Sequence, residues 1–564
     1  MIVGIDLGTT NSLVGAYTAE GPTLFKNTLG DLLTPSVVSV DENGDVIIGQ
    51  AARDRMVSHP NVSVAAFKRW MGSGRETRLG TRSFRPEELS ALLLRSLIAD
   101  AEAALGAKVD EAVISVPAYF SDAQRKATRA AGELAGIKVE RLINEPTAAA
   151  LAYGLQERKG GGRFLVFDLG GGTFDVSILE LFEGVVEVHA SAGDNFLGGE
   201  DFLEVLVAAC LSDSGIDRNT LDARELGQLR HRLERVKREL SANALVRVEL
   251  RLKDKSTAWE IGEERFSKLS DELVQRMRAP LERAMRDAKL TPADLDEIVL
   301  VGGASRMPLV ARLVSRMFGR LPLRHVNPDQ AIALGATIAA GLKVRDERLE
   351  EVILTDVCPY TLGTEVSKRD HSGEPQSGFF HPIIHRNSTV PVSREDAFYP
   401  ITEHQKRLLI GVFQGESPLV DKNIKLGELE VPLAPASKAK DERGVVVRFT
   451  YDINGALQVE AKVLATGKVY ELLLQQNAGL LSEAEIRARF AALASIKVHP
   501  REKQENVAVL ARAERLYEEV IDQREAIQEW IVRFQSIVDT QDEARIREER
   551  EALTKALDEL EAHV

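Results

Sequence analysis

The chain has little cysteine, few aromatic side chains and no excess of positive charge. Its 564 residues include two cysteines, Cys210 and Cys358, and 5% aromatic residues. Two cysteines cannot build a disulfide framework in a chain of this length, which fits a reducing compartment. Acidic residues number 86 against 72 basic ones, so the net charge is −14. This balance argues against nucleic-acid binding through a large basic face, because that mode depends on neutralising phosphates.

Long hydrophobic runs are also missing. No segment without Asp, Glu, Lys or Arg is longer than 13 residues, the length of the segment from Gln330 to Leu342. A membrane-spanning helix needs about 20 apolar residues. The amino terminus starts directly with a strand-like run at Ile2 and lacks the basic head and apolar core of a signal peptide. We therefore expect a cytoplasmic protein that binds neither membrane nor nucleic acid.

Three kinds of sequence pattern follow one another along the chain. Short β-rich apolar runs alternate with helical stretches up to about residue 346, which is typical of an α/β domain. Alternating strands then follow, and the turn signal Asn454-Gly455 between two of them indicates an antiparallel β domain. The last part is helical and opens with a capping box at Ser482. We predict domains at 1–346, 357–480 and 481–564, joined by a linker at 347–356.

The linker ends in a short apolar segment, Val352 to Leu354, after a charged stretch. Exposed apolar linkers are unusual, because apolar surface is stabilised by burial. The segment fits an ordinary edge strand or core segment. It also fits a docking strand that can occupy two places.

One motif occurs twice. The segment Asp6–Asn11 (DLGTTN) recurs as Asp168–Thr173 (DLGGGT), each between two strand-like runs. Glycines let backbone N–H groups approach an anion, threonines add donors, and an aspartate at a strand end can hold Mg²⁺ through water. No Gly-Lys-Ser/Thr sequence follows either copy, so neither is a Walker loop. Paired structural turns are the alternative, but two copies favour a nucleotide clamp.

Two further segments fit a nucleotide pocket. Val301–Arg306 ends a strand with a glycine pair, which can pass close to a ribose or phosphate, although an ordinary strand-to-helix turn has the same pattern. Glu234, Lys237, Arg238 and Ser241 are three or four positions apart and would share one helix face. Without context, that face would be interpreted as solvated.

Together these segments resemble the DnaK-type heat-shock chaperones, the 70-kDa heat-shock protein family. The shared motifs keep the family's order and are Gly4–Ser12, Val116–Phe120, Ile143–Ala150, Asp168–Asp175, Leu197–Phe202 and Val301–Pro308. The resemblance covers roughly the first 480 residues and is greatest to the HscC branch. It implies a multidomain fold: an actin-like (ribonuclease H-like, duplicated) α/β ATPase domain, an antiparallel β-sandwich that binds peptides, and a C-terminal helical lid.

The resemblance implies a role for each residue of the nucleotide site. Lys68 matches the lysine that orients the attacking water. Taken alone, Lys68 would be interpreted as a solvated surface charge. The residues expected to act in catalysis are Asp6, Lys68, Glu145, Asp168, Thr173 and Asp175. Those expected to bind ATP or ADP are Gly8, Thr9, Thr10, Asn11, Gly171, Gly172, Thr173, Gly199, Glu200, Glu234, Lys237, Arg238, Ser241, Gly302, Gly303, Ala304, Arg306 and Asp329. The resemblance also implies Mg²⁺, held through water by Asp6, Glu145 and Asp168, with K⁺ as a further ion.

The family's pattern also implies coupling between ATP and peptide. The residues expected to carry it are Pro117, Arg125, Arg141, Asn144, Leu354 and Asp356. Arg141 and Asn144 match positions where J-domain co-chaperones dock. Thr355 stands where the family's linker usually has leucine, which is a departure from the pattern.

The predicted peptide pocket departs further from the family. Its lining positions fall on Thr364, Ser367, Phe398, Leu408, Ile410 and Val447. Thr364 and Ser367 occupy positions that are usually apolar, and each costs the pocket about 1–2 kcal/mol of transfer free energy. We therefore expect weaker or narrower binding of leucine-rich peptides. The stretch around Leu252 to Ile261 is compact, which puts dependence on a GrpE-like exchange factor in doubt.

The function implied by the resemblance is that of an ATP-dependent chaperone. ATP hydrolysis to ADP and phosphate would control the binding of unfolded polypeptides, with a J-domain partner and a monomeric chain. A small-molecule kinase of the same fold is one alternative, but it leaves the last 200 or so residues unexplained. An actin-like filament that uses ATP structurally is another.

Overall fold

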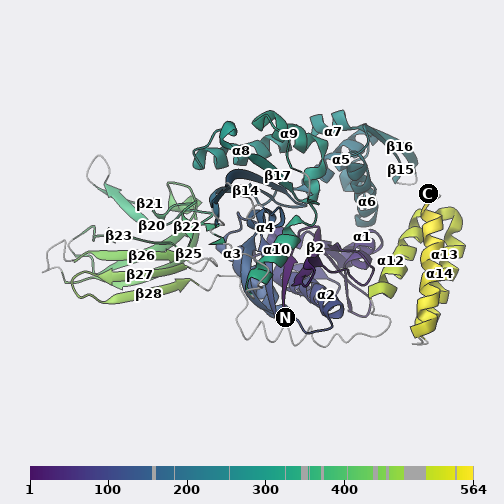
Figure 1. The fold of residues 1–564 in the computed structure, drawn as a ribbon, viewed down its shortest axis with the longest axis horizontal. Coiled ribbons are helices and arrows are strands. Elements are labelled where there is room, and N and C mark those ends of the chain that lie inside the picture. Colours follow the sequence, from purple (N-terminus) through teal and green to yellow (C-terminus); the bar gives the residue numbers. More distant parts are fainter. Residues whose placement is uncertain are drawn as a thin grey trace.

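The computed structural model has three parts, an α/β domain, a β-sandwich and a helical bundle; the α/β domain lies between the other two (Figure 1). It describes residues 1–154, 161–182, 185–252, 255–323, 326–343, 353–354, 356–369, 374–390, 392–402, 404–435, 443–451, 457–474, 504–539 and 543–562. The predicted turn at Asn454-Gly455 and the capping box at Ser482 lie outside the described residues. None of the helices in the described ranges is long and apolar enough to cross a membrane.

The first half of the α/β domain, residues 1–154, is built on a mixed sheet with strand order β11-β10-β1-β2-β3, to which β4 adds through β2. Its strands are β1 (Ile2–Asp6), β2 (Asn11–Thr18), β3 (Gly21–Leu24), β4 (Thr34–Pro35), β10 (Glu111–Val116) and β11 (Lys138–Asn144). The smaller strands are β5 (Val37–Val40), β6 (Val46–Ile48), β7 (Ser63–Ala65), β8 (Thr77–Leu79) and β9 (Arg82–Phe84). Its helices are α1 (Gln50–Ser58), α2 (Pro86–Leu105), α3 (Asp122–Ala135), α4 (Glu145–Ala152) and the 3-10 helices η1 (Pro60–Val62) and η2 (Phe67–Trp70).

The second half, residues 161–343, repeats this arrangement with strand order β17-β12-β13-β14-β18. Its strands are β12 (Gly162–Leu169), β13 (Phe174–Phe182), β14 (Val185–Asp194), β15 (Leu245–Leu252), β16 (Lys255–Gly262), β17 (Glu297–Val301) and, from the linker, β18 (Ile353–Leu354). Its helices are α5 (Gly199–Ser214), α6 (Ala223–Glu239), α7 (Glu263–Leu269), α8 (Asp271–Asp287), α9 (Pro308–Phe318), α10 (Ala331–Lys343), η4 (Arg218–Thr220), η5 (Pro292–Asp294) and η6 (Gly303–Arg306).

The repeated motif takes the same place in both halves. β1 runs antiparallel to β2 and parallel to β10. β12 likewise runs antiparallel to β13 and parallel to β17. The strand–turn–strand prediction is therefore confirmed for both copies. Local residue choice explains it, because buried apolar strands flank a turn of glycine and threonine.

Two helices join the halves through very close packing. α10 contacts α4 and β1. A Cβ added at Gly335 would lie 1.8 Å from the Ala148 carbonyl oxygen, and one at Gly4 would lie 2.2 Å from the backbone nitrogen of Thr337. Only glycine fits at these two positions. This contact packs the two halves directly against each other.

The β domain consists of two four-stranded antiparallel sheets, β21-β20-β24-β25 and β23-β26-β27-β28. Its strands are β19 (Asp356–Val357), β20 (Leu362–Arg369), β21 (Pro375–Ile384), β22 (Thr389–Val390), β23 (Val392–Phe398), β24 (Arg407–Gln414), β25 (Ile424–Pro432), β26 (Val445–Tyr451), β27 (Leu457–Val463) and β28 (Val469–Leu474), with the 3-10 helix η7 (Val420–Lys422). β26 pairs with β27 as the sequence predicts, and Phe449 and Val459 are fully buried between the sheets.

The helical end folds as a bundle of α12 (Gln504–Glu519), α13 (Arg524–Asp539) and α14 (Glu543–Ala562), with the 3-10 helix η10 (Ile521–Gln523) between α12 and α13. Ile527, Phe534 and Leu557 are completely buried in its core. α12 packs against α1, on the side of the α/β domain away from the β-sandwich (Figure 1). The described part of the bundle therefore covers the α/β domain, whereas a lid over the β domain was expected.

The region predicted to be compact forms a hairpin of two eight-residue strands, β15 and β16. Trp259 and Ile261 of this hairpin are buried, and β15 packs against α6. The hairpin is thus present and partly built into the second half.

Candidate nucleotide site

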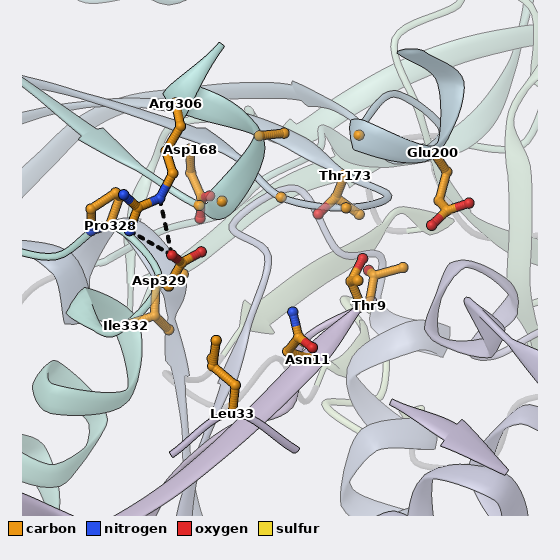
Figure 2. A pocket seen from close by; sticks show the side chains of 18 of the residues that line it. Thr9, Asn11, Leu33, Asp168, Thr173, Glu200, Arg306, Pro328, Asp329 and Ile332 are labelled. Atoms are coloured by element: carbon orange, nitrogen blue, oxygen red, sulfur yellow. Dashed lines mark hydrogen bonds and ion pairs between the residues drawn. The ribbon is translucent and has the colours of Figure 1, made fainter. Parts of the chain in front are cut away.

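A cleft of about 380 Å³ lies where the two copies of the motif approach each other (Figure 2). The two loops touch across it. A Cβ added at Gly171 would lie 1.7 Å from Thr10 Oγ1, and one at Gly172 would lie 2.6 Å from Thr9 Cγ2. Glycine in the second copy is therefore required for the loops to close on each other. Such a pair of glycine–threonine loops presents backbone N–H groups and hydroxyls to an anion between them.

The first loop is held in shape by hydroxyl groups. The backbone N–H of Gly8 donates to Ser12 Oγ at 3.1 Å, and Ser36 Oγ donates to the Gly8 carbonyl at 2.8 Å. In the second loop, the Gly170 N–H donates to the Thr173 carbonyl at 3.1 Å. These bonds fix the backbone before any ligand arrives, which is what a preorganised anion site needs.

Four buried carboxyl groups lie around the loops: Asp6, Glu145, Asp168 and Asp175. Ser115 Oγ donates to Asp6 at 2.8 Å, and the Tyr119 N–H donates to Asp175 at 3.0 Å. Asp168 Oδ2 is buried and has no hydrogen-bond partner among the described residues.

Burial and the nearby Glu145 carboxyl raise the pKa of Asp6 and of Asp175 to about 7 each, and raise the pKa of Asp168 well above its usual range. A cation would stabilise the charged forms of these groups. The described residues contain no group of three or more side chains close enough to hold a metal ion directly. Carboxylate oxygens are ligands that suit Mg²⁺, an ion that usually keeps several of its waters, so the chemistry of these donors fits the ion.

Lys68 provides a positive charge at this cluster. It lies on η2, is only 3% exposed, and its Nζ is 2.7 Å from Glu145 Oε1. The same ammonium lies 5.6 Å from the centre of the Phe120 ring, within the range of a cation–π contact. A buried ammonium held in this way is a defined point charge rather than a solvated one.

The other end of the cleft lies between α6 and η6. Lys237 Nζ donates to the Gly199 carbonyl at 2.8 Å, and Glu234 pairs with Lys237 at 2.7 Å and with Arg238 at 3.0 Å. Across from them, Arg306 forms two bonds to Asp329, at 3.0 and 2.6 Å (Figure 2). Helix α6 ends at Glu239, so Ser241 lines the cleft from the following turn.

Nearly all residues predicted for the nucleotide site line this one cleft. They are Asp6, Gly8, Thr9, Thr10, Asn11, Lys68, Glu145, Asp168, Gly171, Thr173, Gly199, Glu200, Glu234, Lys237, Arg238, Ser241, Gly302, Gly303, Ala304, Arg306 and Asp329. Two predicted residues do not line it: Asp175 is buried beneath the loop, and Gly172 contacts Thr9 and Arg69.

The structure adds lining residues that the sequence did not indicate. These are Leu13, Leu33, Gly170, Met307, Pro328 and Ile332. Pro328 and Ile332 flank Asp329 and give the cleft an apolar wall, which suits a flat ring (Figure 2). Pro328 and Ile332 lie close to Asp329 in the sequence, and this is the one signal that could have predicted them as lining residues.

Comparison with known proteins agrees with this geometry. The model of the family described as "Hsp70 protein" matches residues 2–82 and 73–564. The chaperone protein DnaK of Thermotoga petrophila is 39% identical over 530 residues, which is 91% of this chain and 87% of the relative. The DnaK proteins of Thermotoga maritima and Thermotoga neapolitana match with the same identity and coverage.

The chain belongs to the Hsp70 family. It is therefore an ATP-dependent chaperone and an ATPase, and the kinase interpretation is not supported. The expected assignment to the HscC branch is compatible with these matches and stays a prediction.

The Hsp70 residues predicted to couple ATP to peptide form a chain of contacts beneath the cleft. Arg125 donates to the carbonyls of Ala118 and Phe120, at 3.0 and 3.2 Å, and to Asn144 Oδ1 at 2.7 Å. The Asn144 amide in turn donates to Asp356, whose pKa is raised by burial. Asn144 immediately precedes Glu145, so this chain reaches the partner of Lys68.

The remaining coupling residues lie near the same contacts. Arg141 is close enough to Asp356 to interact electrostatically with it. Leu354 pairs with Val186, so the linker strand β18 extends the second sheet at β14. The Pro117 carbonyl accepts a bond from Phe120 N–H at 3.1 Å. This pairing fits both interpretations of the linker, an edge strand and a docking strand seen in one of its two places.

The β-sandwich also contacts the α/β domain directly. Arg386 pairs with Asp287 at 2.9 Å, and Tyr360 Oη donates to the Tyr119 carbonyl at 2.9 Å. Lys126 Nζ donates to the Leu474 carbonyl at 2.5 Å. The two domains are therefore docked through groups on α3, on α8 and on the loop before α3.

The predicted peptide-lining residues differ in exposure. Val447 is 0% exposed, Thr364 2% and Ile410 4%, so these three lie in the interior of the sandwich. Phe398 and Leu408 are partly buried against the same core. Ser367 bonds to Ser377 across β20 and β21 at 3.0 Å, on an exposed part of the sheet.

Proposed function

We propose that the α/β domain is an actin-like, duplicated ATPase domain in which ATP lies in the cleft, with its phosphates between the two loops. The contact of the two motif copies around a single cleft carries this proposal. The adenosine would lie between α6 and the Gly302–Arg306 turn, where Glu234, Arg238 and Asp329 offer polar groups. The apolar side chains of Pro328 and Ile332 would bound the ring.

Mg²⁺ would be held through water by Asp6, Glu145 and Asp168. Bound there, the ion would neutralise the negative charge of the phosphates, which the nearby buried carboxylates would otherwise repel. The partnerless Asp168 oxygen and the raised pKa of Asp6 support a cation at this point. Thr173 and Asp175 would help to hold the second loop, and K⁺ stays an expectation from the resemblance.

Lys68 would orient the attacking water toward the γ-phosphate. Its position supports this role, because a buried ammonium beside Glu145 can hold a water and attract the transferred phosphoryl group at once. Lys68→Ala should therefore abolish hydrolysis in single-turnover assays while ATP still binds.

Docking of the linker and the β-sandwich is proposed to transmit the nucleotide state. In this view Asp356 and Asn144 connect the linker to Glu145, and a J-domain partner acts near Arg141. Unfolded polypeptides would bind the β domain around Phe398 and Leu408. The chain would work as a cytoplasmic monomer. The doubt about a GrpE-like exchange factor rested on a compact region, and the structure has the hairpin of β15 and β16 in that region.

The helical end is proposed to be the lid, held against the ATPase domain in this docked state. Arg515 lies 3.7 Å from Asp54 of α1, and Gln504 Nε2 donates to Ser96 Oγ at 3.0 Å. Glu518 accepts from Arg224 at 2.8 Å, at the start of α6. With α12 engaged there, the described part of the helical end lies away from the β-sandwich (Figure 1).

The test is ATP turnover with and without an unfolded peptide and a J-domain. Stimulation by both is expected for a coupled chaperone. Turnover that ignores both would contradict the coupling, and failure to bind ATP would contradict the nucleotide site itself.

A further inference from the structure

Arg69, next to Lys68 in the chain, makes a contact that no motif indicated. Lys68 and Glu145 both come from the first half of the ATPase domain, and the second phosphate loop comes from the second half. Hydrolysis needs Lys68 at a fixed distance from a phosphoryl group that the second loop also holds. Some group has to fix that distance across the cleft.

The Arg69 side chain crosses from one half to the other. Its Nε donates to the Gly172 carbonyl at 2.9 Å, inside the second loop. Its guanidinium also pairs with Asp201 in the first turn of α5. Asp201 Oδ2 in turn accepts a bond at 2.8 Å from the N–H of Gly198, just before that helix. One arginine thus ties η2 to the second loop and to the helix that follows it.

The contact is close and largely shielded from water. The side chains of Arg69 and Asp201 are 15% and 23% exposed. A Cβ on Gly172 would lie 2.8 Å from Arg69 Nε, so only glycine admits the guanidinium there. A planar guanidinium serves two acceptors with fixed geometry, which the point charge of a lysine cannot do.

The surrounding turn depends on such contacts across the halves. Ala66, immediately before η2, has φ +55°, a left-handed conformation that residues other than glycine rarely adopt. Trp70, at the other end of η2, packs against Phe196 of the second half with ring centres 5.5 Å apart. The turn that carries Lys68 is therefore shaped in part by groups of the second half.

We propose that Arg69 is a positioning residue for ATP hydrolysis, which places Lys68 relative to the second phosphate loop. The proposal rests on the proposed role of Lys68. Arg69 acts through Lys68 and Gly172 and need not touch the nucleotide. Its loss should slow the chemical step far more than it weakens ATP binding.

The test compares Arg69→Ala, Arg69→Lys and Asp201→Asn by single-turnover hydrolysis and by ATP affinity. Arg69→Ala should lower the hydrolysis rate about ten- to a hundredfold while the Kd for ATP changes less than about threefold. Arg69→Lys keeps the charge and should recover part of the rate. Asp201→Asn keeps the size of the side chain and an acceptor for the Gly198 N–H. Its hydrolysis rate should fall less than that of Arg69→Ala, again with little change in the Kd for ATP.

Arg75→Ala is the matched control, because Arg75 lies 4.3 Å from the centre of the Trp70 ring in the same segment and is itself exposed. Its hydrolysis rate should equal that of the wild type. If Arg69→Ala fails to fold, the hydrolysis rates and ATP affinities of Asp201→Asn and Arg69→Lys test the proposal instead. An equal loss of affinity and rate, or an unchanged rate, would overturn the proposal. Lys68→Ala separates the two ideas: an active Lys68→Ala variant refutes the role of Lys68, and an inactive one beside a normal Arg69→Ala refutes only that of Arg69.

Discussion

The two copies of the phosphate motif share a backbone but differ in what surrounds them. In the first copy, Asp6 is bonded by Ser115, and the same half supplies Lys68 and Glu145. In the second copy, Asp168 keeps an oxygen without a partner among the described residues. The second half also supplies α6, which lines the end of the cleft proposed to hold the adenosine, and it accepts the linker strand β18.

This difference indicates that the two halves have different roles in ATP hydrolysis. The first half holds the charge proposed to act on the attacking water, and the second half is proposed to hold the adenosine and accepts the linker strand β18. Hydrolysis then depends on how closely the halves approach. A signal from the β-sandwich can reach the chemistry by changing that approach, without altering any group that touches ATP.

The largest effect is expected when the approach of the two loops is blocked. Gly171→Ala would place a methyl group 1.7 Å from Thr10 Oγ1, so the loops must separate. Since a displacement of about 1 Å can cost about a hundredfold in rate, we expect at least that loss in ATP turnover, with weaker ATP binding.

Steady-state turnover and ATP titration would measure both quantities. Gly74→Ala is the control, because a Cβ at Gly74 meets no atom within 4 Å. Normal turnover of Gly171→Ala would show that the two loops need not touch.

A smaller effect is expected from the second half alone. Glu234 is largely buried, and the nearby Lys237 and Arg238 hold its pKa below the usual range although burial opposes this. Glu234→Gln should weaken ATP binding about tenfold, because a hydrogen bond donated to a charged group contributes about 1.5–3 kcal/mol. The rate at saturating ATP should change little. A fall in that rate with unchanged affinity would contradict the different roles of the two halves.

The smallest effect is expected at the contact of the helical end with α6. Glu518 accepts bonds from Arg224 and Gln228, and the Arg224 side chain is half exposed. Exposed ion pairs contribute about 0.2–1 kcal/mol, so Glu518→Lys should speed ADP release only about two- to fivefold. Stopped-flow release of a fluorescent ADP would measure this rate. The charge swap Glu518→Lys with Arg224→Glu should restore slow release, and a swap without effect would argue against the contact.

Local patterns predicted much of this molecule. The strand–turn–strand copies and the β26–β27 pairing were predicted because their signals lie within a few adjacent residues. The roles of Lys68 and Asp356 came from the family resemblance, since neither residue stands out in isolation. Their neighbours in the structure, Glu145 and Asn144, are adjacent in sequence. One motif therefore contains a partner of each residue.

Long-range contacts account for what the sequence did not indicate. Arg69 reaches partners more than 100 positions away, at Gly172 and Asp201. The docking of α12 on α1 depends on matching apolar surfaces such as Ala52 and Ala511, which no spacing rule connects. An apolar helix face predicts burial but does not name the surface that buries it.

The proposed coupling through the docked linker is tested by single-turnover ATP hydrolysis of the wild type and of Asp356→Asn, with and without a J-domain. Asp356 accepts a bond from Asn144, next to Glu145, and the substitution keeps the shape of the side chain but removes its charge. We expect clear stimulation of the wild type, much weaker stimulation of Asp356→Asn, and equal ATP affinity. Normal stimulation of Asp356→Asn would overturn this coupling, because the signal would then bypass the docked linker.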